Sequence, residues 1–419
     1  MLENALEIFS GKVFEFITNE NRIKRDLLVK KHSEHLQVLG DFSFPNTLKS
    51  WRGVLNSTRV TNECDNNLLK SIGKKPEVLV EESQKWVLKV KNVKEVNDRI
   101  HLFLVRPIAI RVGLTDGLKN KYLISQKIDE GTSKVQLDPL CEDTKCITSL
   151  RLKHLTKSIQ NLYTLSEECG EKAPSIVVSS KSTSRSDDGQ MILCGTVLNS
   201  KTGVKECAVT ADNFIKLRQN EMTLIAQHKY GVRVSTDTKW KEFIAHLGES
   251  AVVFELLQTK PSSAVKINFD HSASGSSKGA AFILYNCARL ETIIKTYNDK
   301  VDEGIYPPLS DFESIDFSLL TQEDEWTLVF NYILGLPSLL SNCVEVSDRS
   351  CEFRPHHVCS FLSSMVRVFS QYYRKVRILT EPRTHLLPVM FARIHMLRIL
   401  NDTLKTCLRI LNIKSVSQM

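Results

Sequence analysis

The stretch GAAFILYNCARLETIIK, residues 279–295, decides how the last third of this chain folds. Apolar residues recur along it every three or four positions, at Ile283, Cys287, Leu290 and Ile294. This spacing predicts an amphipathic helix whose apolar stripe packs into a core. Tyr285 and Arg289 lie one turn apart on a different, more polar face of the same helix. The pair could pack inside a bundle or face a binding partner.

Two further helices are predicted downstream, over residues 354–379 and 387–413. Pro355 suits the first turn of the earlier helix, where a missing N–H costs nothing. The earlier helix carries the apolar residues Val358, Leu362, Met365, Val366 and Phe369. The later one carries Met390, Ile394, Leu397, Leu400, Leu404, Cys407, Leu408 and Leu411. Short connections between such helices favour a helical bundle from residue 276 to the end.

Charge is distributed unevenly over this helical region. Residues 279–353 hold four basic and thirteen acidic side chains, whereas residues 354–419 hold eleven basic and two acidic ones. The last 66 residues therefore carry 11 − 2 = +9, against +8 for the whole chain. Such a concentration suits a polyanionic partner, and it equally suits a basic face paired with the acidic segment before it.

The first 130 residues mix helical and strand-like patterns. A first helix is predicted near the start, since Leu2, Leu6, Phe9, Val13 and Phe16 fall at helical spacing. The segments WVLKVKNV (86–93) and HLFLVRPIAIRVGL (101–114) alternate as half-buried strands do, with Pro107 breaking or edging the second. We expect a mixed α/β domain over residues 1–130.

Residues 131–275 form a second predicted region of mixed character. It is interrupted by KAPSIVVSSKSTSRSDDGQ (172–190), whose Ser/Thr-rich part buries little apolar surface and is predicted to be a flexible loop. The chain is long enough for two or three domains, each with its own core. The expected fold class is α+β, with a C-terminal all-α bundle over residues 276–419.

Composition indicates the cellular compartment of the protein and whether a membrane or a metal ion is involved. The chain has 11 cysteines and no CxxC pair, which fits a reducing compartment, and we expect a cytoplasmic protein. No run of eighteen apolar residues or signal-peptide pattern is found, so no membrane association is expected. CEFRPHHVC (351–359) holds two cysteines and two histidines, but His357 turns away from the helix face shared by His356 and Cys359. No metal or cofactor is therefore expected.

FILYNCARLETII resembles the helix that opens the DALR anticodon-binding domain of arginyl-tRNA synthetases. The pattern Tyr-x-x-Ala-Arg falls on Tyr285, Ala288 and Arg289. RPHHVCSFL…VFSQYYRKVRIL resembles the second part of that domain, and ARIHMLRILNDTLKTCLRILNI its closing helix. AHLGESAVVFELL…INFDHS (245–272) is similar to the segment that precedes the domain. The resemblance covers residues 240–419 well and weakens before them.

Synthetases of this class also carry an HxGH element and a KMSKS loop for ATP chemistry. The best match to HxGH is the tetrad Arg151-Leu152-Lys153-His154, where Lys replaces the Gly that lets backbone approach a phosphate. The KMSKS position falls within residues 193–214, where Lys201 and Lys205 keep only the charge. Some 35 residues separate the two places, too few for a nucleotide-binding sheet. We expect a reduced, non-catalytic remnant.

An anticodon-binding domain on a decayed synthetase body is similar to a family of non-enzymatic tRNA adaptors. That resemblance implies binding of arginine tRNAs and presentation of their anticodon loop to a methyltransferase-like partner that makes 3-methylcytidine. By analogy with synthetases, residues 1–130 would contact the tRNA body. The alternatives are an arginyl-tRNA synthetase that uses ATP, and a scaffold whose basic face docks an acidic protein.

Anticodon bases are unstacked, so aromatic rings and arginine planes can stack on them while basic side chains neutralise phosphates. Adjacent helical residues diverge by about 100°, so one of Tyr372 and Tyr373 is expected in the core. For Arg289 the alternative role is an ion pair within the bundle. The predicted tRNA-binding residues are Tyr285, Arg289, Arg367, Tyr372, Tyr373, Arg374, Lys375, Arg377, Arg393 and Arg398.

Overall fold

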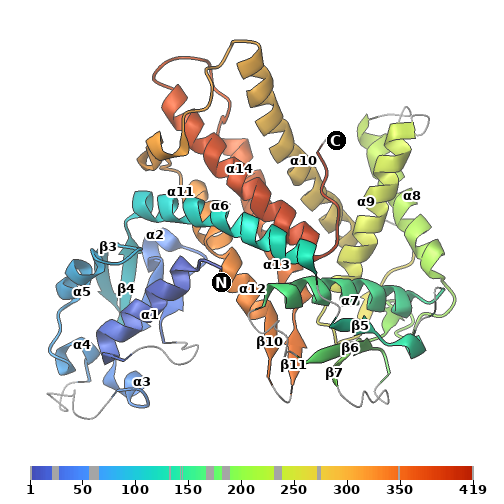
Figure 1. The fold of residues 1–419 in the computed structure, drawn as a ribbon, viewed down its shortest axis with the longest axis horizontal. Coiled ribbons are helices and arrows are strands. Elements are labelled where there is room, and N and C mark those ends of the chain that lie inside the picture. Colours follow the sequence, from blue (N-terminus) through green and yellow to red (C-terminus); the bar gives the residue numbers. More distant parts are fainter. Residues whose placement is uncertain are drawn as a thin grey trace.

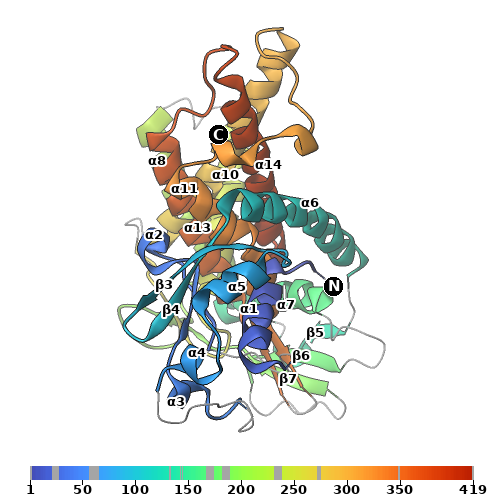
Figure 2. The same ribbon diagram turned by 90° about the vertical axis from the view of Figure 1, so that its left-hand side faces the viewer.

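The computed structural model describes most of the chain as three packed regions (Figures 1 and 2). The N-terminal lobe is an antiparallel sheet, in the strand order β1-β2-β4-β3, packed against helices. Residues described are 2–20, 28–55, 66–131, 134–141, 143, 145–166, 174–181, 189–230, 238–270, 275–347 and 350–417. The elements of this lobe are α1 (Ala5–Thr18), β1 (Lys30–Lys31), α2 (Leu36–Leu39), β2 (Phe42–Pro45), α3 (Leu48–Trp51), α4 (Leu68–Ser71), α5 (Pro76–Ser83), β3 (Val90–Val96) and β4 (Arg99–Leu104).

The predicted first helix is confirmed, the first predicted strand (86–93) is confirmed only from Val90 onward, and the second strand needs correction. The Asn4 side chain caps α1 by accepting from the Glu7 N–H, and Asn19 ends it in the left-handed conformation. Strand β4 stops at Leu104, and the rest of segment 101–114 lies in helix α6 (Arg106–Glu130). Pro107 lies in the first turn of that helix instead of breaking a strand, because the first helical turn needs no N–H from it.

The middle region holds a parallel three-stranded sheet, β5-β6-β7, and a separate parallel pair, β8-β9. The predicted loop at 172–190 is wrong in part, because Ser175–Ser179 forms strand β6 with Ile176 and Val178 fully buried. Its residues 172–173 and 182–188 lie outside the described part of the chain. The elements are β5 (Val135–Leu137), a 3-10 turn (Pro139–Cys141), α7 (Ile147–Leu165), β6, β7 (Gly189–Leu193), β8 (Val197–Asn199), α8 (Ala211–Tyr230), α9 (Thr238–Leu257) and β9 (Val265–Ile267).

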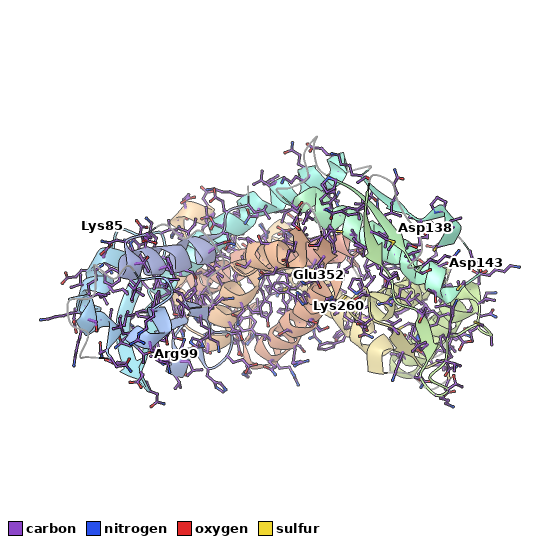
Figure 3. All side chains as sticks on the ribbon, turned by 90° about the horizontal axis from the view of Figure 1, so that it is seen from below. Lys85, Arg99, Asp138, Asp143, Lys260 and Glu352 are labelled. Carbon is purple, nitrogen blue, oxygen red and sulfur yellow. The ribbon has the colours of Figure 1, made fainter. Side chains whose placement is uncertain are left out.

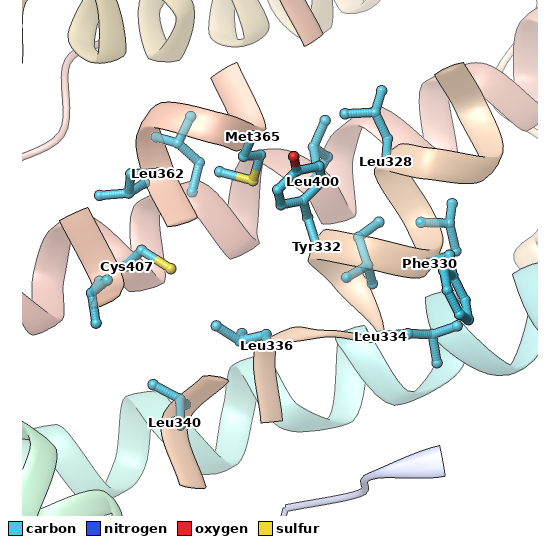
Figure 4. Close-up of a cluster of buried hydrophobic side chains, with 14 of the residues drawn as sticks. Leu328, Phe330, Tyr332, Leu334, Leu336, Leu340, Leu362, Met365, Leu400 and Cys407 are labelled. Carbon is cyan, nitrogen blue, oxygen red and sulfur yellow. The ribbon is translucent and has the colours of Figure 1, made fainter. Parts of the chain in front are cut away.

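The C-terminal region is the predicted helical bundle, with a short hairpin that the sequence did not predict. Tyr332, Leu336, Leu362 and Leu400, from the helices η6, α12, α13 and α14, belong to its buried core (Figure 4). The elements are α10 (Gly275–Asp302), the 3-10 turns η4 (Phe312–Ser314) and η5 (Phe317–Leu319), α11 (Glu323–Thr327), the π-helical η6 (Leu328–Ile333), α12 (Leu336–Cys343), β10 (Val344–Val346), β11 (Cys351–Phe353), α13 (Pro355–Lys375) and α14 (Leu387–Ile410).

One hydrophobic cluster runs through all three regions, instead of a separate core in each. Helix α6 lies across the molecule and packs on both α14 and η6, so it joins the N-terminal lobe to the bundle (Figure 1). A smaller second cluster lies around Val197, Phe214 and Val265 in the middle region. Among the described residues no helix could span a bilayer, and the described cysteines carry free thiols.

Candidate nucleic-acid interface

Helices α10 and α13 bring three of the predicted residues together at the surface. Tyr285 and Arg289 come from α10, and Tyr373 comes from the last turn of α13. The Arg289 guanidinium carbon lies 4.5 Å from the ring centre of Tyr285 and 4.5 Å from that of Tyr373. An arginine at this distance from two rings gains cation–π attraction from both. We call these three residues the Tyr–Arg–Tyr cluster.

Hydrogen bonds orient the arginine of the Tyr–Arg–Tyr cluster. Arg289 donates to the Tyr285 hydroxyl at 2.8 Å and to the Asn286 side-chain oxygen at 3.3 Å. No acidic partner of Arg289 is found in the described part of the chain. The ion pair considered for Arg289 from the sequence is thus replaced by neutral partners, and the positive charge stays uncompensated locally.

A hollow of about 420 Å³ opens beside the cluster. Tyr373 is 40% exposed, so its ring is open to a ligand. Thr292 and Thr296 line the wall of the hollow. The Thr292 hydroxyl donates to the Ala288 carbonyl at 2.8 Å, so towards a ligand it acts as an acceptor. The complete lining is Tyr285, Ala288, Arg289, Thr292, Ile293, Thr296, Tyr373 and Leu379. The site therefore offers ring faces, a cationic plane and hydroxyls, the groups that hold an unstacked base.

Phe282 is a residue of this surface that the sequence reading missed. It is 39% exposed and precedes Tyr285 by three positions and Arg289 by seven, which places all three on one side of α10. The sequence spacing could have indicated this residue, because an aromatic side chain three positions before Tyr285 and outside the apolar stripe lies on the helix face that carries Tyr285 and Arg289. Phe282 adds a further exposed ring along the helix.

Tyr372 belongs to the core, which corrects its predicted role in binding tRNA, and Arg393 is largely buried beside it. Tyr372 is fully buried, and its hydroxyl donates to Glu325 Oε1 at 2.9 Å. Arg393 Nε donates to the same oxygen at 2.8 Å. Burial, with the Glu325 charge beside it, raises the pKa of Tyr372 well above its ordinary value. The expectation that one of the two adjacent tyrosines is core is confirmed, with Tyr372 inside and Tyr373 outside.

The remaining predicted basic residues lie at the surface of the bundle. Arg367 and Arg374 are two turns apart on α13 and both are exposed. Arg374 donates to the Ser370 carbonyl at 3.2 Å, and Arg398 donates to Asn298 at 2.8 Å. Lys375 pairs with Asp324 at 3.0 Å in an exposed ion pair, whereas Arg377 is exposed just beyond the helix.

Both readings of the charge distribution hold in part. Within the described residues, Arg367, Arg374, Arg377 and Arg398 form no ion pair. Four other basic side chains after residue 353 pair with the acidic segment before it. These pairs are Arg354 with Glu345 and Glu352, Lys375 with Asp324, Arg393 with Glu325, and Lys405 with Glu291. These four arginines therefore carry positive charge that no described carboxylate neutralises and that phosphates could meet.

Arg151, the first residue of the tetrad matched to HxGH, has a structural role and hydrogen-bonds to the main chain of other segments. Its side chain is 1% exposed and donates to the carbonyls of Leu256 at 3.0 Å, Gly195 at 2.7 Å and Ser263 at 2.8 Å. These bonds hold α7 to the end of α9 and to the segments that enter β8 and β9. The guanidinium therefore serves the main chain and is not presented to a ligand.

Of the other residues matched to the synthetase signatures, His154 is half-buried, whereas Lys153, Lys201 and Lys205 are exposed. Burial lowers the pKa of His154 to about 4, and the nearby Lys153 charge adds to the effect. Both side chains border a hollow of about 400 Å³. Lys201 pairs with Asp270 at 2.8 Å, and Lys205 is exposed. No group of described His, Cys, Asp or Glu side chains is arranged to hold a metal ion.

Residues 283–419 match the family model of the DALR anticodon binding domain, so the match includes most of α10, with the Tyr–Arg–Tyr cluster, and all of α13 and α14. The last third of the chain is thus similar to a DALR anticodon-binding domain. Over 238 residues the chain is 33% identical to DALR anticodon-binding domain-containing protein 3 of Danio rerio, and over 231 residues it is 34% identical to that of Mus musculus.

The chain spans less than half the length of these relatives. The matches cover 55% and 54% of this chain but 42% and 43% of the Danio and Mus proteins.

The chain is also 24% identical over 261 residues to the arginine–tRNA ligase of Borrelia garinii, and the match covers 62% of this chain and 39% of the ligase. Among solved structures, Thermus thermophilus arginyl-tRNA synthetase matches with a TM-score of 0.43 and 17% identity, over 58% of this chain and 41% of that chain.

Proposed function

We propose that this protein is a non-catalytic, cytoplasmic adaptor that binds arginine tRNAs through its DALR anticodon-binding domain. It would present their anticodon loop to a methyltransferase-like partner that forms 3-methylcytidine. The observation that carries the tRNA-binding part is the Tyr–Arg–Tyr cluster, a partly exposed cation–π arrangement in the segment that matches the DALR anticodon binding domain. The methyltransferase and the choice of arginine tRNAs rest on the resemblance to the adaptor family.

The proposed division of labour follows from the chemistry of each group. Tyr373 and Tyr285 offer faces on which an anticodon base stacks, and Arg289 between them offers a plane and N–H donors. Arg367, Arg374, Arg377 and Arg398 lack ion pairs within the described residues, so they are suited to phosphates without first losing a partner. Tyr372 and Arg393 support the bundle beneath them.

A titration at fixed, near-physiological salt tests this function. The full chain would be mixed with arginine tRNAs and with several other tRNAs of matched length, and Tyr373→Ala would be measured in parallel. We expect tight binding that favours arginine tRNAs and a loss of about tenfold or more on removal of one stacking ring. Equal binding to every tRNA would reduce the site to a basic surface, and no binding would overturn the proposal.

The rival synthetase activity is addressed by a separate measurement. An aminoacylating enzyme would exchange pyrophosphate into ATP in the presence of arginine and tRNA. We expect no exchange, because Arg151 is fully engaged with main-chain carbonyls at the tetrad matched to the ATP-binding element. Exchange above background that is lost in His154→Ala would establish enzymatic activity and contradict the adaptor proposal.

A further inference from the structure

Asn286 is a polar residue at a position of α10 where the helical pattern predicts an apolar one. It follows Ile283 by three residues and precedes Leu290 by four, and both of these neighbours on the stripe are buried. Asn286 is itself fully buried. Burying an amide costs free energy unless its hydrogen bonds are made, so the choice of asparagine here has a cause other than apolar packing.

The other buried asparagines of the described chain link segments that are distant in sequence. Five asparagines are buried among these residues, and they are Asn46, Asn120, Asn161, Asn286 and Asn401. The side chains of the four besides Asn286 hydrogen-bond to residues at least 23 positions away. Both side-chain hydrogen bonds of Asn286 stay within α10 and reach no further than four residues. Within the described part of the chain, Asn286 therefore links α10 to no other element.

The two hydrogen bonds of Asn286 orient its amide towards Arg289. Nδ2 donates to the Phe282 carbonyl at 2.8 Å, and Oδ1 accepts from Arg289 Nη1 at 3.3 Å. A carbonyl can only accept and a guanidinium can only donate, so a single orientation of the amide satisfies both partners. An apolar side chain would make neither bond, and an ionised aspartate could not donate to the carbonyl. Asparagine is therefore suited to hold Arg289 from within the same helix.

Arg289 is held by neutral groups, whereas ion pairs hold several other cations of the molecule. Lys260, for example, lies beside Glu352 (Figure 3) and pairs with it at 2.7 Å. Arg289 donates instead to the Asn286 amide and to the Tyr285 hydroxyl. A carboxylate at position 286 would also orient the guanidinium, but it would neutralise the charge and compete with a phosphate for it. The amide orients Arg289 and leaves its positive charge in place.

We propose that Asn286 is a positioning residue for tRNA binding, an inference that rests on the proposed function. It holds the Arg289 guanidinium beside the rings of Tyr285 and Tyr373 before the RNA arrives. Restraining a flexible side chain in advance lowers the conformational entropy that is lost on binding. The remaining N–H groups of the guanidinium can then donate to a base edge or a phosphate.

Two substitutions of Asn286 and a matched control test this role in the full chain. Asn286→Ala and Asn286→Ser both remove the acceptor for Arg289, while serine keeps a hydroxyl that can donate to the carbonyl one turn earlier. Asn161→Ala is the control, because Asn161 is a buried asparagine that donates to the carbonyls of Arg409 and Ile410 and so links α7 to α14. Binding of arginine tRNA is titrated at several salt concentrations, and urea unfolding measures the stability of each variant.

We expect both Asn286 variants to bind tRNA about fivefold more weakly than wild type, because Arg289 must be ordered on binding. The slope of affinity against salt should stay unchanged, since the Arg289 charge remains. Asn161→Ala should unfold at a lower urea concentration and bind tRNA as wild type does. Wild-type affinity in Asn286→Ser, or an equal loss of affinity in Asn161→Ala, would overturn the positioning role.

Asn286→Asp separates the orientation of Arg289 from its charge. The carboxylate keeps an acceptor beside the guanidinium but compensates its positive charge. We expect weaker tRNA binding and a salt slope that is shallower by about 0.7, the contribution of one phosphate contact in a single strand. A wild-type affinity and slope in this variant would overturn the proposal that the amide keeps the Arg289 charge for the RNA.

A double-mutant cycle shows whether Asn286 acts through Arg289. In the Arg289→Ala background, Asn286→Ser should cause no further loss of tRNA affinity, because the group that it positions is gone. A further loss of about fivefold would indicate a purely structural effect, and it would overturn the positioning role while the adaptor function stands. Absence of tRNA binding by the wild type would instead refute the adaptor function, and this inference with it.

Discussion

In the proposed site the guanidinium carbon of Arg289 lies 4.5 Å from the centres of two tyrosine rings at once. Arg289→Lys keeps the charge but removes the plane and most of the donors. We expect tRNA affinity to fall about tenfold, or about 1.4 kcal/mol, in the titration described above. Arg374→Lys is the matched control, because a phosphate contact needs mainly the charge. Equal losses of tRNA affinity in Arg289→Lys and Arg374→Lys would show that the planar guanidinium of Arg289 contributes nothing to tRNA affinity beyond its charge.

Glu325 is the buried acceptor of hydrogen bonds from three other residues of the bundle. It is fully buried and accepts hydrogen bonds from Tyr372 and Arg393, while its other oxygen accepts from the Gln322 N–H at 3.0 Å. Arg393→Met would leave a buried carboxylate without its cation, so we expect a loss of about 3 kcal/mol in the free energy of unfolding by urea. Tyr372→Phe removes one hydrogen bond to a charged group and should cost about 1.5 kcal/mol. A smaller loss in Arg393→Met than in Tyr372→Phe would contradict this ordering.

The sequence could predict the pairing of Tyr285 with Arg289 but not the third member of the cluster. Helical spacing places the first two on one face, since they are four residues apart in one helix. Tyr373 is 84 residues further on, and its approach to Arg289 depends on how α13 packs against α10. The packing of α13 against α11 decides that Tyr372 points inward to Glu325, a residue whose burial no local pattern indicates.

Helix α6 can cross the bundle closely because two glycines lie at its contact surface. A Cβ added at Gly117 would meet the Ile399 side chain at 2.7 Å and the Ile333 side chain at 3.0 Å, and one at Gly113 would meet Leu334 at 2.7 Å. The atoms opposed to Gly117 are branch carbons close to the backbone, which have little freedom to move. The two glycines are therefore needed at this crossing.

Gly117→Ala should destabilise the protein by about 1–2 kcal/mol. Overpacking typically costs about 1–3 kcal/mol, and the better helix propensity of alanine offsets up to about 1 kcal/mol of it. Gly11→Ala in α1 is the matched control, because no atom lies within 4 Å of its added Cβ, and it should be neutral or stabilising. Urea unfolding of the two variants measures both effects. Destabilisation by Gly11→Ala of the same size would rule out packing as the cause.

Local sequence patterns were sufficient to predict a helix where one of its faces is apolar and the other is polar. The stripes of α1, α13 and α14 were read correctly for this reason. Residues 106–114 were misread because short apolar runs fit a strand as well as a buried helix start. Strand β6 was missed because only Ile176, Val177 and Val178 signal it, and its parallel partners β5 and β7 lie in distant parts of the sequence.

For the molecule as a whole, the sequence did not reveal that the N-terminal lobe is joined to the bundle by polar as well as apolar contacts. Trp326 Nε1 donates to Asp41 at 2.8 Å, and Arg106 pairs with Glu323 at 2.6 Å. Both contacts link residues more than two hundred positions apart. Such long-range pairs have no periodic signature, so the expectation of separate cores could not be corrected before the structure was known.

Asp41 makes this junction sensitive to pH. Burial raises its pKa to about 6, although hydrogen bonds from Leu104 and Trp326 oppose the shift. An unfolded aspartate titrates near pH 3.9, so between about pH 4 and 6 the folded state binds more protons than the unfolded state. The stabilisation that Asp41 gives in its protonated form is therefore present at about pH 4 and is lost as the pH rises through 6. A shift of about two units corresponds to about 3 kcal/mol.

Asp41→Asn should remove this dependence, because an amide does not ionise. We expect the unfolding free energy of the variant, relative to wild type, to rise by about 2–3 kcal/mol between pH 4 and pH 7. Urea unfolding of both proteins at several pH values measures the difference, and histidines common to both cancel from it. Glu313→Gln, at a largely exposed carboxylate, is the control and should track wild type at every pH. A constant gap between Asp41→Asn and wild type would mean that Asp41 is already ionised at pH 4 and that the junction does not respond to protons.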